Sequence, residues 1–269
     1  MSTFLILGGT GKTGRRLAQQ LRIAGHAPRL ASRGPRGDVV FDWRNPSTYP
    51  EALRGVEGVF VVGPGSATDW TPQLTEFLRV ADAAGVARVV LLSARGVEFL
   101  PTGIVARAED ALRSGPVPST ILRPSHFAQN FTEAMFVPVD GRVIAPVGDG
   151  AEPFIDVADI AEVAAVVLAD DGFDGEVLEL SGPEAITFDQ AVGALNAVTG
   201  HSVVFVDESD DDHIARLRAA GTPEAYVTWR MAMLRGIRSG ADARVSDGVQ
   251  RALHRAPTSF ADWAAREAA

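Results

Sequence analysis

A glycine pattern near the N-terminus is the residue set with the clearest chemical use. Gly9-Thr10-Gly11-Lys12-Thr13-Gly14 has the spacing G-x-G-x-x-G and follows a short apolar run, Phe4–Leu7. A helical pattern comes next and stops at Gly25. Strand, glycine turn and helix stand in the order that dinucleotide binding requires, because glycine lets the backbone approach a pyrophosphate that the helix N-terminus attracts. The expected nucleotide contacts are Gly8, Gly9, Thr10, Gly11, Lys12 and Thr13.

The residues after the second predicted strand, Pro28–Ala31, bear on which nicotinamide cofactor would bind. An acidic residue at this place accepts from a ribose 2′-hydroxyl, whereas an arginine accommodates a 2′-phosphate. Ser32 and Arg33 stand here, with Arg29 and Arg36 nearby. A guanidinium fork matches the geometry and the charge of a phosphate, so we expect NADP(H) in preference to NAD(H). The alternative is that Arg33 is a solvated arginine at a strand end.

Further cofactor contacts are expected at the ends of the other predicted strands. Asp42 follows the strand Val39–Phe41, where its carboxylate could accept from an adenine amino group or could simply serve the turn. The remaining expected contacts each lie at or just beyond a strand end, and they are Trp43, Gly63, Pro64, Ser93 and Pro124.

The elements that must position these residues alternate between apolar strands and helices. Beyond those already given, strands are predicted at Gly58–Val62, Arg88–Leu92, Ser119–Arg123 and Val177–Leu180, and helices at Glu51–Arg54, Leu74–Ala83, Ile104–Ser114 and Val157–Leu168. Continuously apolar strands that alternate with helices indicate a parallel sheet buried on both faces. The predicted fold class is therefore α/β, a doubly wound parallel sheet of Rossmann type.

The regular alternation fades after Arg123, where prolines and glycines break residues 124–153 into loops. Thr187 is predicted to cap a helix that runs to Thr199, Val203–Val206 is predicted as a strand, and the chain from Asp210 onward as helical. We expect one domain over residues 1–269, in which roughly 124–153 and 181–269 form a small α/β substrate lobe at the carboxyl edge of the sheet, where open α/β folds bind ligands.

Composition excludes several classes of protein. The net charge of −9 over 269 residues disfavours a nucleic-acid partner, and no apolar run of about 18 residues could span a membrane. No export signal is visible, so a cytoplasmic location is expected. The chain has no cysteine, which excludes disulfides, thiolate catalysis and thiolate zinc sites, and its five histidines are scattered, so no metal is expected. A triphosphate-binding P-loop is excluded because its first glycine would fall at Ile6.

The motifs together resemble those of NmrA-like atypical short-chain dehydrogenases/reductases, and within that group the ergot-alkaloid branch with its agroclavine dehydrogenase-type iminium reductases. The similarity extends over nearly the whole chain and is carried by Gly8–Arg16, Ala31–Arg33, Phe41–Trp43, Val89–Ala94, Ile121–Phe127 with Asn130, and Phe154–Ile160. The resemblance implies an NADP(H)-binding reductase of secondary metabolism that acts on a small molecule, but it does not identify the substrate.

One departure from the wider reductase superfamily concerns the proton donor. Those enzymes usually carry a Tyr-x-x-x-Lys pair on the helix after the fifth strand. Here that segment, Thr102–Leu112, contains neither residue, and if Glu109 takes the family's glutamate position the pair would fall at Pro101 and Val105. Ser93 remains at the strand end without a tyrosine partner. Either the protein does not catalyse, or its acceptor needs no acid from a tyrosine.

Two kinds of acceptor fit the second possibility. An iminium carbon already has the positive charge that a ketone gains by protonation, so positioning alone can supply much of the rate. A quinone can instead take protons from water or a weak donor, for which His126 is one candidate because its free pKa is near neutrality. His126 could equally be a loop histidine with a structural hydrogen bond. An apolar pocket could be lined by His126, Phe127, Asn130, Phe154, Trp229 and Met233, each of which could instead belong to the core.

These observations predict an NADP(H)-dependent oxidoreductase that transfers hydride to a small organic acceptor of imine, iminium or enone type without a Tyr-Lys pair. Ser93 and His126 are the candidate catalytic residues. Two alternatives stay open: a non-catalytic NADP(H)-sensing regulatory protein, and a quinone or azo reductase. A monomer and a homodimer are equally compatible with the sequence.

Overall fold

The computed structural model describes residues 1–64 and 68–267, which divide into two compact units. The first unit comprises Met1–Ala94, Thr102–Arg123 and Val157–Glu179. The second comprises Arg95–Pro101, Pro124–Asp156 and the described residues from Leu180 onward. No helix in the described ranges has both the length and the apolar character needed to cross a membrane.

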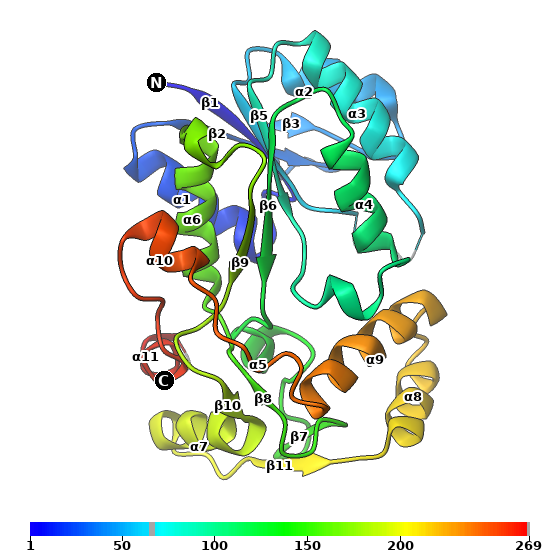
Figure 1. Cartoon of the computed structure of the whole chain (residues 1–269), viewed down its shortest axis with the longest axis vertical. Helices are drawn as coiled ribbons and strands as arrows, with labels where there is room; N and C mark the ends of the chain where they lie inside the picture. The colour runs from blue at the N-terminus through cyan, green and yellow to red at the C-terminus, as the bar shows by residue number, and fades with distance from the viewer. Residues whose placement is uncertain (65–67, 268–269) are drawn as a thin grey trace. The chain divides into compact units, whose positions relative to one another are not determined.

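A seven-stranded sheet forms the centre of the first unit (Figure 1). Its strands are β1 (Thr3–Leu7), β2 (Ala27–Ser32), β3 (Val39–Val40), β4 (Gly58–Val61), β5 (Arg88–Leu92), β6 (Ser119–Pro124) and β9 (Val177–Leu180). They follow the order β3-β2-β1-β4-β5-β6-β9, and the pairs from β3 to β6 are parallel. The strand order reverses between β1 and β4, which is the switch point where such sheets bind ligands. The predicted doubly wound fold is therefore confirmed.

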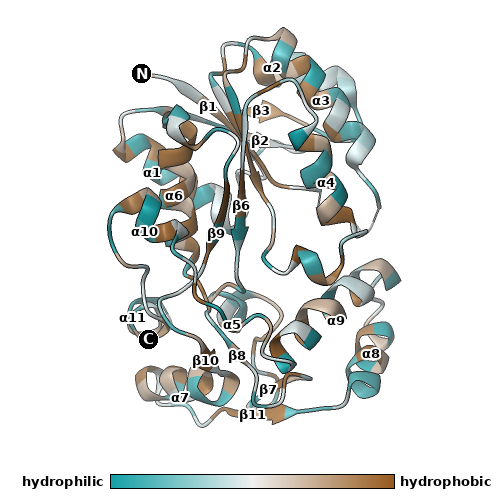
Figure 2. Cartoon of the chain, viewed as in Figure 1, coloured by the Kyte–Doolittle hydropathy of each residue, from teal (hydrophilic) through white to brown (hydrophobic). Residues whose placement is uncertain are grey.

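Helices cover both faces of this sheet. The helices are α1 (Lys12–Ile23), α2 (Tyr49–Leu53), α3 (Thr71–Ala83), α4 (Ile104–Arg113) and α6 (Val157–Ala169), with single 3₁₀ turns η1 (Pro46–Thr48) and η3 (Asp171–Phe173). In Figure 1, α1 and α6 lie side by side on one face, and α2, α3 and α4 lie on the other. Figure 2 shows the apolar residues concentrated on the strands and on the inner faces of these helices.

The second unit has shorter strands and more helices. Its strands are β7 (Arg142–Ala145), β8 (Ala151–Glu152), β10 (Ile186–Thr187) and β11 (Val204–Asp207). Its helices are α5 (Asn130–Glu133), α7 (Phe188–Thr199), α8 (Asp210–Ala219), α9 (Glu224–Arg238), α10 (Gly248–Leu253) and α11 (Phe260–Glu267). A 3₁₀ turn, η2 (Val97–Phe99), also belongs to this unit. β7 pairs with β11 in parallel, and β8 pairs with β10 antiparallel.

Local sequence signals explain how the second unit is built. Thr187 caps α7 in a reciprocal capping box with Gln190, and the helix ends at Gly200 in the left-handed conformation, as its position predicts. The predicted strand Val203–Val206 is confirmed with a shift of one residue. The core is aromatic: Phe136 and Phe188 lie 4.8 Å apart between ring centroids, in an edge-to-face arrangement.

Candidate functional site

The glycine turn between β1 and α1 leaves its backbone open. Gly8 has φ +73°, and the N–H of Gly11 donates to the carbonyl of Gly8 at 2.9 Å, which closes a tight turn. A Cβ on Gly14 would lie 2.4 Å from the Gly8 oxygen, so this glycine permits the close packing of α1 on the turn. A Cβ on Gly11 would meet only that oxygen, at 3.2 Å, and Gly11 is exposed. The surface of the turn is therefore shaped for a ligand that approaches closely.

The N-cap residue of α1 is a glycine, which has no side chain to cap the helix. Gly11 is its N-cap residue, and the first turn contains no acidic side chain. The chain's single lysine, Lys12, is the first helical residue. The N–H groups and the positive dipole end of a helix favour negative charge, so this N-terminus could bind an anionic ligand.

The carboxyl edge of the sheet brings further expected cofactor residues into one row. Because β1 to β5 are parallel, the residues after each strand lie at the same edge. Arg33 follows β2, is exposed, and forms no hydrogen bond or ion pair with any described residue. Asp42 follows β3 and accepts from the N–H of Arg44 at 3.0 Å through Oδ1. One oxygen of the Asp42 carboxylate thus stabilises the turn that follows β3, and the other, Oδ2, can accept from another donor.

The other expected cofactor residues differ in accessibility. Trp43 is buried against Trp70, with ring centroids 5.0 Å apart, so most of its surface belongs to the core. Gly63 is partly exposed after β4 and is followed by the exposed Pro64. Pro124 is buried at the end of β6. The open part of the row thus runs from the β1 turn to the ends of β2 and β4.

Ser93 stands where the reductase superfamily carries a serine, and its hydroxyl group makes a hydrogen bond within the protein. Its hydroxyl donates to Oε1 of Glu109 at 2.5 Å. The same buried carboxylate accepts from Arg123 at 2.9 and 2.5 Å and from Arg113 at 2.8 Å. Burial raises the pKa of Glu109, but the hydrogen bonds from Arg123 and Ser93 and the two arginine charges outweigh it, so the pKa lies below its ordinary value. Glu109 is therefore ionised at neutral pH and fixes α4 to β5 and β6.

Neither of the two tyrosines lies on α4, the helix after the fifth strand. Tyr49 is buried and donates to the carbonyl oxygen of Trp43 at 2.9 Å, and burial with the nearby charge of Asp42 raises its pKa to about 12. Tyr226 lies on α9 and packs on Trp229, with ring centroids 5.6 Å apart. The helix α4 presents no phenol, and Tyr49 is a structural hydrogen-bond donor.

His126 lies in a buried polar cluster of the second unit. Its backbone N–H donates to Oε1 of Glu152 at 3.0 Å, and its Nδ1 lies 3.3 Å from the same oxygen. One oxygen of Asp242 completes a group in which the polar atoms of the three side chains all lie within 4.8 Å of one another. Arg95 is also present, with Nε 3.3 Å from Oδ1 of Asp242. Of these four residues, sequence reasoning identified only His126.

The other residues expected to line a pocket are placed differently from one another. Phe154 is buried between Phe131 and Phe188, with ring centroids 5.2 and 5.4 Å away, and Asn130 and Met233 are also buried. Phe127 and Trp229 are partly exposed. All of them belong to the second unit, as His126 does. The partly exposed side chains are the ones with surface left for a ligand.

Comparison with known proteins agrees with this geometry. Residues 8–171 match the protein family described as NAD(P)H-binding. The chain is 36% identical over 274 residues to the uncharacterized oxidoreductase YesF of Bacillus subtilis, covering 98% of this chain and 95% of the relative. It is 30% identical over 279 residues to agroclavine dehydrogenase of Claviceps fusiformis, covering 97% of this chain and 96% of the relative. The crystal structure of NmrA, a negative transcriptional regulator in complex with NAD, has the same fold, with a TM-score of 0.78 at 16% identity, covering 99% of this chain and 95% of that one.

The matched residues make up more than half of the chain and include the glycine turn, α1 and the residues that follow strands β1 to β6. The predicted resemblance is confirmed by the clavine relative and by the NmrA fold. The chain thus belongs to the NAD(P)H-binding family, is related to a clavine dehydrogenase over nearly its whole length, and shares its fold with NmrA.

Proposed function

We propose that the protein is an NADP(H)-dependent oxidoreductase that transfers hydride to a small organic acceptor without a Tyr-Lys pair. The observation that carries the proposal is the exposed glycine turn at the switch point of the sheet, followed directly by α1, whose N-cap residue is a glycine. A reduced nicotinamide would supply the hydride. The open positions Gly8, Gly11 and Gly63 would contact its pyrophosphate and ribose, and Asp42 could accept from the adenine amino group.

The choice of NADP(H) rests on charge at the end of β2. Arg33 and Arg36 are both exposed, and no described residue pairs with either guanidinium. A 2′-phosphate would provide the anion that this arginine pair lacks, whereas a 2′-hydroxyl would not. No carboxylate follows β2 directly to compete for that position.

Replacement of Arg33 tests this preference. We expect NADPH to bind at least about tenfold more tightly than NADH, which corresponds to about 1.4 kcal/mol. Arg33→Asp should erase or invert the preference, because a carboxylate repels the phosphate and can accept from the 2′-hydroxyl. The measurement is calorimetric titration of both cofactors.

A matched control makes the same charge change elsewhere. Arg22 lies in the last turn of α1, about 15 Å along the helix from Lys12. Arg22→Asp should leave the ratio of the two affinities unchanged. Equal affinities of the unmodified protein for NADPH and NADH would contradict the assignment of Arg33.

The oxidoreductase proposal is tested by NADPH oxidation. The absorbance of NADPH is followed in the presence of cyclic iminium ions, enones and quinones, and we expect at least one class to be reduced well above the uncatalysed rate. If NADPH binds tightly and no acceptor is reduced, the protein is a sensor of the cofactor and the proposal is wrong. The engagement of Ser93 by Glu109 is compatible with either result, since it removes that hydroxyl from proton transfer.

A further inference from the structure

Four ionisable side chains are buried together inside the second unit. They are His126, Glu152, Asp242 and Arg95, whose side chains are 11%, 0%, 2% and 1% exposed. They come, in that order, from the loop after β6, the strand β8, the loop after α9 and the loop after β5. All four segments belong to the second unit, so the cluster is complete within it. Burial of this many charged groups is costly unless their charges balance.

The contacts divide the cluster into two pairs. Nδ1 of His126 lies 3.3 Å from Oε1 of Glu152, which also accepts from the backbone N–H of His126 at 3.0 Å. Nε of Arg95 lies 3.3 Å from Oδ1 of Asp242. One polar atom from each of His126, Glu152 and Asp242 lies within 4.8 Å of the other two. A change of charge on one member of the cluster therefore acts on all the others.

The charges of the four side chains balance only when the cluster holds one proton. Glu152 and Asp242 contribute two negative charges and Arg95 one positive charge, so with a neutral imidazole the sum is −1. A proton on His126 brings the sum to zero, and each pair then joins opposite charges. Loss of that proton leaves a buried carboxylate without a counter-charge. Oε2 of Glu152 and Oδ1 of Asp242 accept no hydrogen bond from the described residues that could disperse this charge.

The directions of the pKa shifts agree with this balance. Burial lowers the pKa of His126, but the charge and hydrogen bond of Glu152 and the charge of Asp242 outweigh it, so the pKa lies above its ordinary value. Burial and the charge of Glu152 raise the pKa of Asp242 to about 7, against the opposing charges of His126 and Arg95. Both groups thus bind a proton more readily in the folded protein than in the unfolded chain.

Two further charges from neighbouring elements act on the cluster with opposite signs. Arg230, on α9, lowers the pKa of His126, whereas Glu98, in η2, raises the pKa of Asp242. Glu98 also pairs with Arg244 at 3.2 Å. The ring of Phe136 lies 5.9 Å from that of His126, between centroids, and contributes no charge. Because these outer charges oppose each other, the protonation of the cluster is decided mainly by its own four members.

We propose that this buried cluster is a pH-sensitive switch, which stabilises the second unit while it holds one proton and destabilises it when the proton is lost. In the protonated form two ion pairs join four segments of the unit, and in the other form one buried negative charge is in excess. The pKa values fix the sign: for a raised pKa, the contribution to stability is fully present below the ordinary pKa and disappears as the pH rises through the folded pKa. That window runs from 3.8 to about 7 for Asp242, and upward from 6.5 for His126. The inference does not depend on the proposed oxidoreductase function.

The test follows thermal unfolding of the full chain, without cofactor, between pH 6 and pH 9. The unfolding temperature of the unmodified protein should fall over this range by roughly 4 °C, the change that corresponds to a shift of about one pKa unit in a chain of this size. Amide hydrogen exchange, expressed as protection factors, locates the loss. Protection should decrease first around Arg95, β8 and Asp242.

Two variants separate the switch from a merely structural role. Glu152→Gln and Asp242→Asn each keep the shape of a side chain and remove one negative charge, so the cluster is balanced without a proton. In either variant the unfolding temperature should no longer fall between pH 6 and pH 9, and at pH 9 it should exceed that of the unmodified protein. Carboxylates with a merely structural role would instead make both variants less stable at every pH.

The protonation of His126 can be measured directly. The NMR signals of its ring hydrogens are identified by their absence from His126→Gln, and their shift with pH gives the pKa. We expect a value above 6.5 in the unmodified protein and a lower value in Glu152→Gln, because this substitution removes the negative charge nearest to the imidazole.

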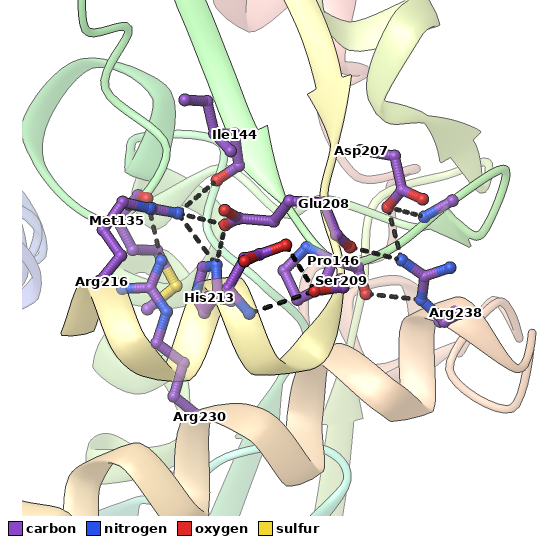
Figure 3. Close-up of polar contacts among 12 residues, drawn as sticks. Met135, Ile144, Pro146, Asp207, Glu208, Ser209, His213, Arg216, Arg230 and Arg238 are labelled. Atoms are coloured by element: carbon purple, nitrogen blue, oxygen red, sulfur yellow. Dashed lines mark hydrogen bonds and ion pairs between the residues drawn. The ribbon is translucent and has the colours of Figure 1, made fainter. Parts of the chain in front are cut away.

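The same unit offers a matched control in a second buried histidine. Figure 3 shows His213 beside Glu208, with Nδ1 2.5 Å from Oε1, and with Arg216 contacting the same carboxylate. Arg216 balances Glu208, so this group needs no proton. Burial and the charges of Arg230 and Arg216 lower the pKa of His213 below its ordinary value despite the hydrogen bond with Glu208. Because a lowered pKa affects stability only on the acid side, His213→Gln should leave the fall in unfolding temperature above pH 7 unchanged.

Several results would overturn the inference. One is a fall in unfolding temperature that persists unchanged in both Glu152→Gln and Asp242→Asn, and another is a pKa of His126 below 6.5. A third is a stoichiometric divalent metal ion in the purified protein that either carboxylate variant loses, because the cation would then balance the cluster in place of the proton. An equal loss of amide protection in the first unit at pH 9 would also contradict a switch in the second.

Discussion

Replacement of Gly11 with valine is expected to abolish NADPH binding while the protein remains folded. Gly11 has φ −80° and ψ 179°, an extended conformation that any residue adopts. Its Cβ would meet one backbone oxygen, that of Gly8, at 3.2 Å, which a shift of a few tenths of an ångström relieves. The side chain would then project over the exposed turn, where a pyrophosphate has to approach the backbone.

Gly14 is expected to behave differently although it belongs to the same pattern. A Cβ there would lie 2.4 Å from the oxygen of Gly8 and 2.7 Å from the Cα of Gly9, both of which are backbone atoms. Gly14→Ala must therefore displace the turn or α1, and it should lower the unfolding temperature as well as the affinity. A matched control is Gly193→Ala on α7, where a Cβ meets nothing within 4 Å.

Two measurements distinguish these expectations. Calorimetric titration gives the affinity for NADPH, and thermal unfolding without the cofactor gives the stability of each variant. We expect Gly11→Val to lose binding with little change in unfolding temperature, Gly14→Ala to lose both, and Gly193→Ala to lose neither. Undiminished NADPH affinity in Gly11→Val would mean that the nucleotide binds elsewhere on the protein.

The parts of the structure that could be predicted from sequence are those with local signals. The strand β1, the glycine turn and α1 are contiguous, and each has a pattern of its own: an apolar run, glycine spacing and helical periodicity. Repetition of that unit also predicts the parallel sheet, because apolar strands that alternate with helices have few other arrangements. The expected cofactor residues follow from the same rule, since the ends of parallel strands meet at one edge.

The buried cluster around His126 could not be predicted in this way. Glu152 lies on the two-residue strand β8, which is too short to show any periodicity, and Asp242 lies 90 residues further along the chain in a loop. Their approach to His126 depends on tertiary packing, which cannot be predicted from the spacing of residues along the sequence. A weak signal existed in Ala151-Glu152-Pro153-Phe154, where one carboxylate stands among apolar residues, but such a residue is more often exposed than buried.

Glu109→Ala is expected to destabilise the protein by about 3 kcal/mol at neutral pH, the largest effect on stability that we expect from a single side chain outside the apolar core. The carboxylate is 1% exposed and is the shared partner of Ser93, Arg123 and Arg113. Its removal leaves Arg123, which is 20% exposed, without its closest counter-charge between α4 and β6. The control is Glu76→Ala on α3, which breaks the exposed Glu76–Arg79 pair and should change stability little.

The pH dependence of this loss tests its electrostatic origin. The pKa of Glu109 in the folded protein lies below its ordinary value of 4.5, so the folded state binds the proton less readily than the unfolded chain does. The contribution of Glu109 is therefore fully present above pH 4.5 and disappears as the pH falls through the folded pKa. Unfolding temperatures of Glu109→Ala and the unmodified protein should differ by roughly 10 °C at neutral pH and converge on acidification. A difference that stays constant down to pH 3 would mean that Glu109 acts through packing and not through its charge.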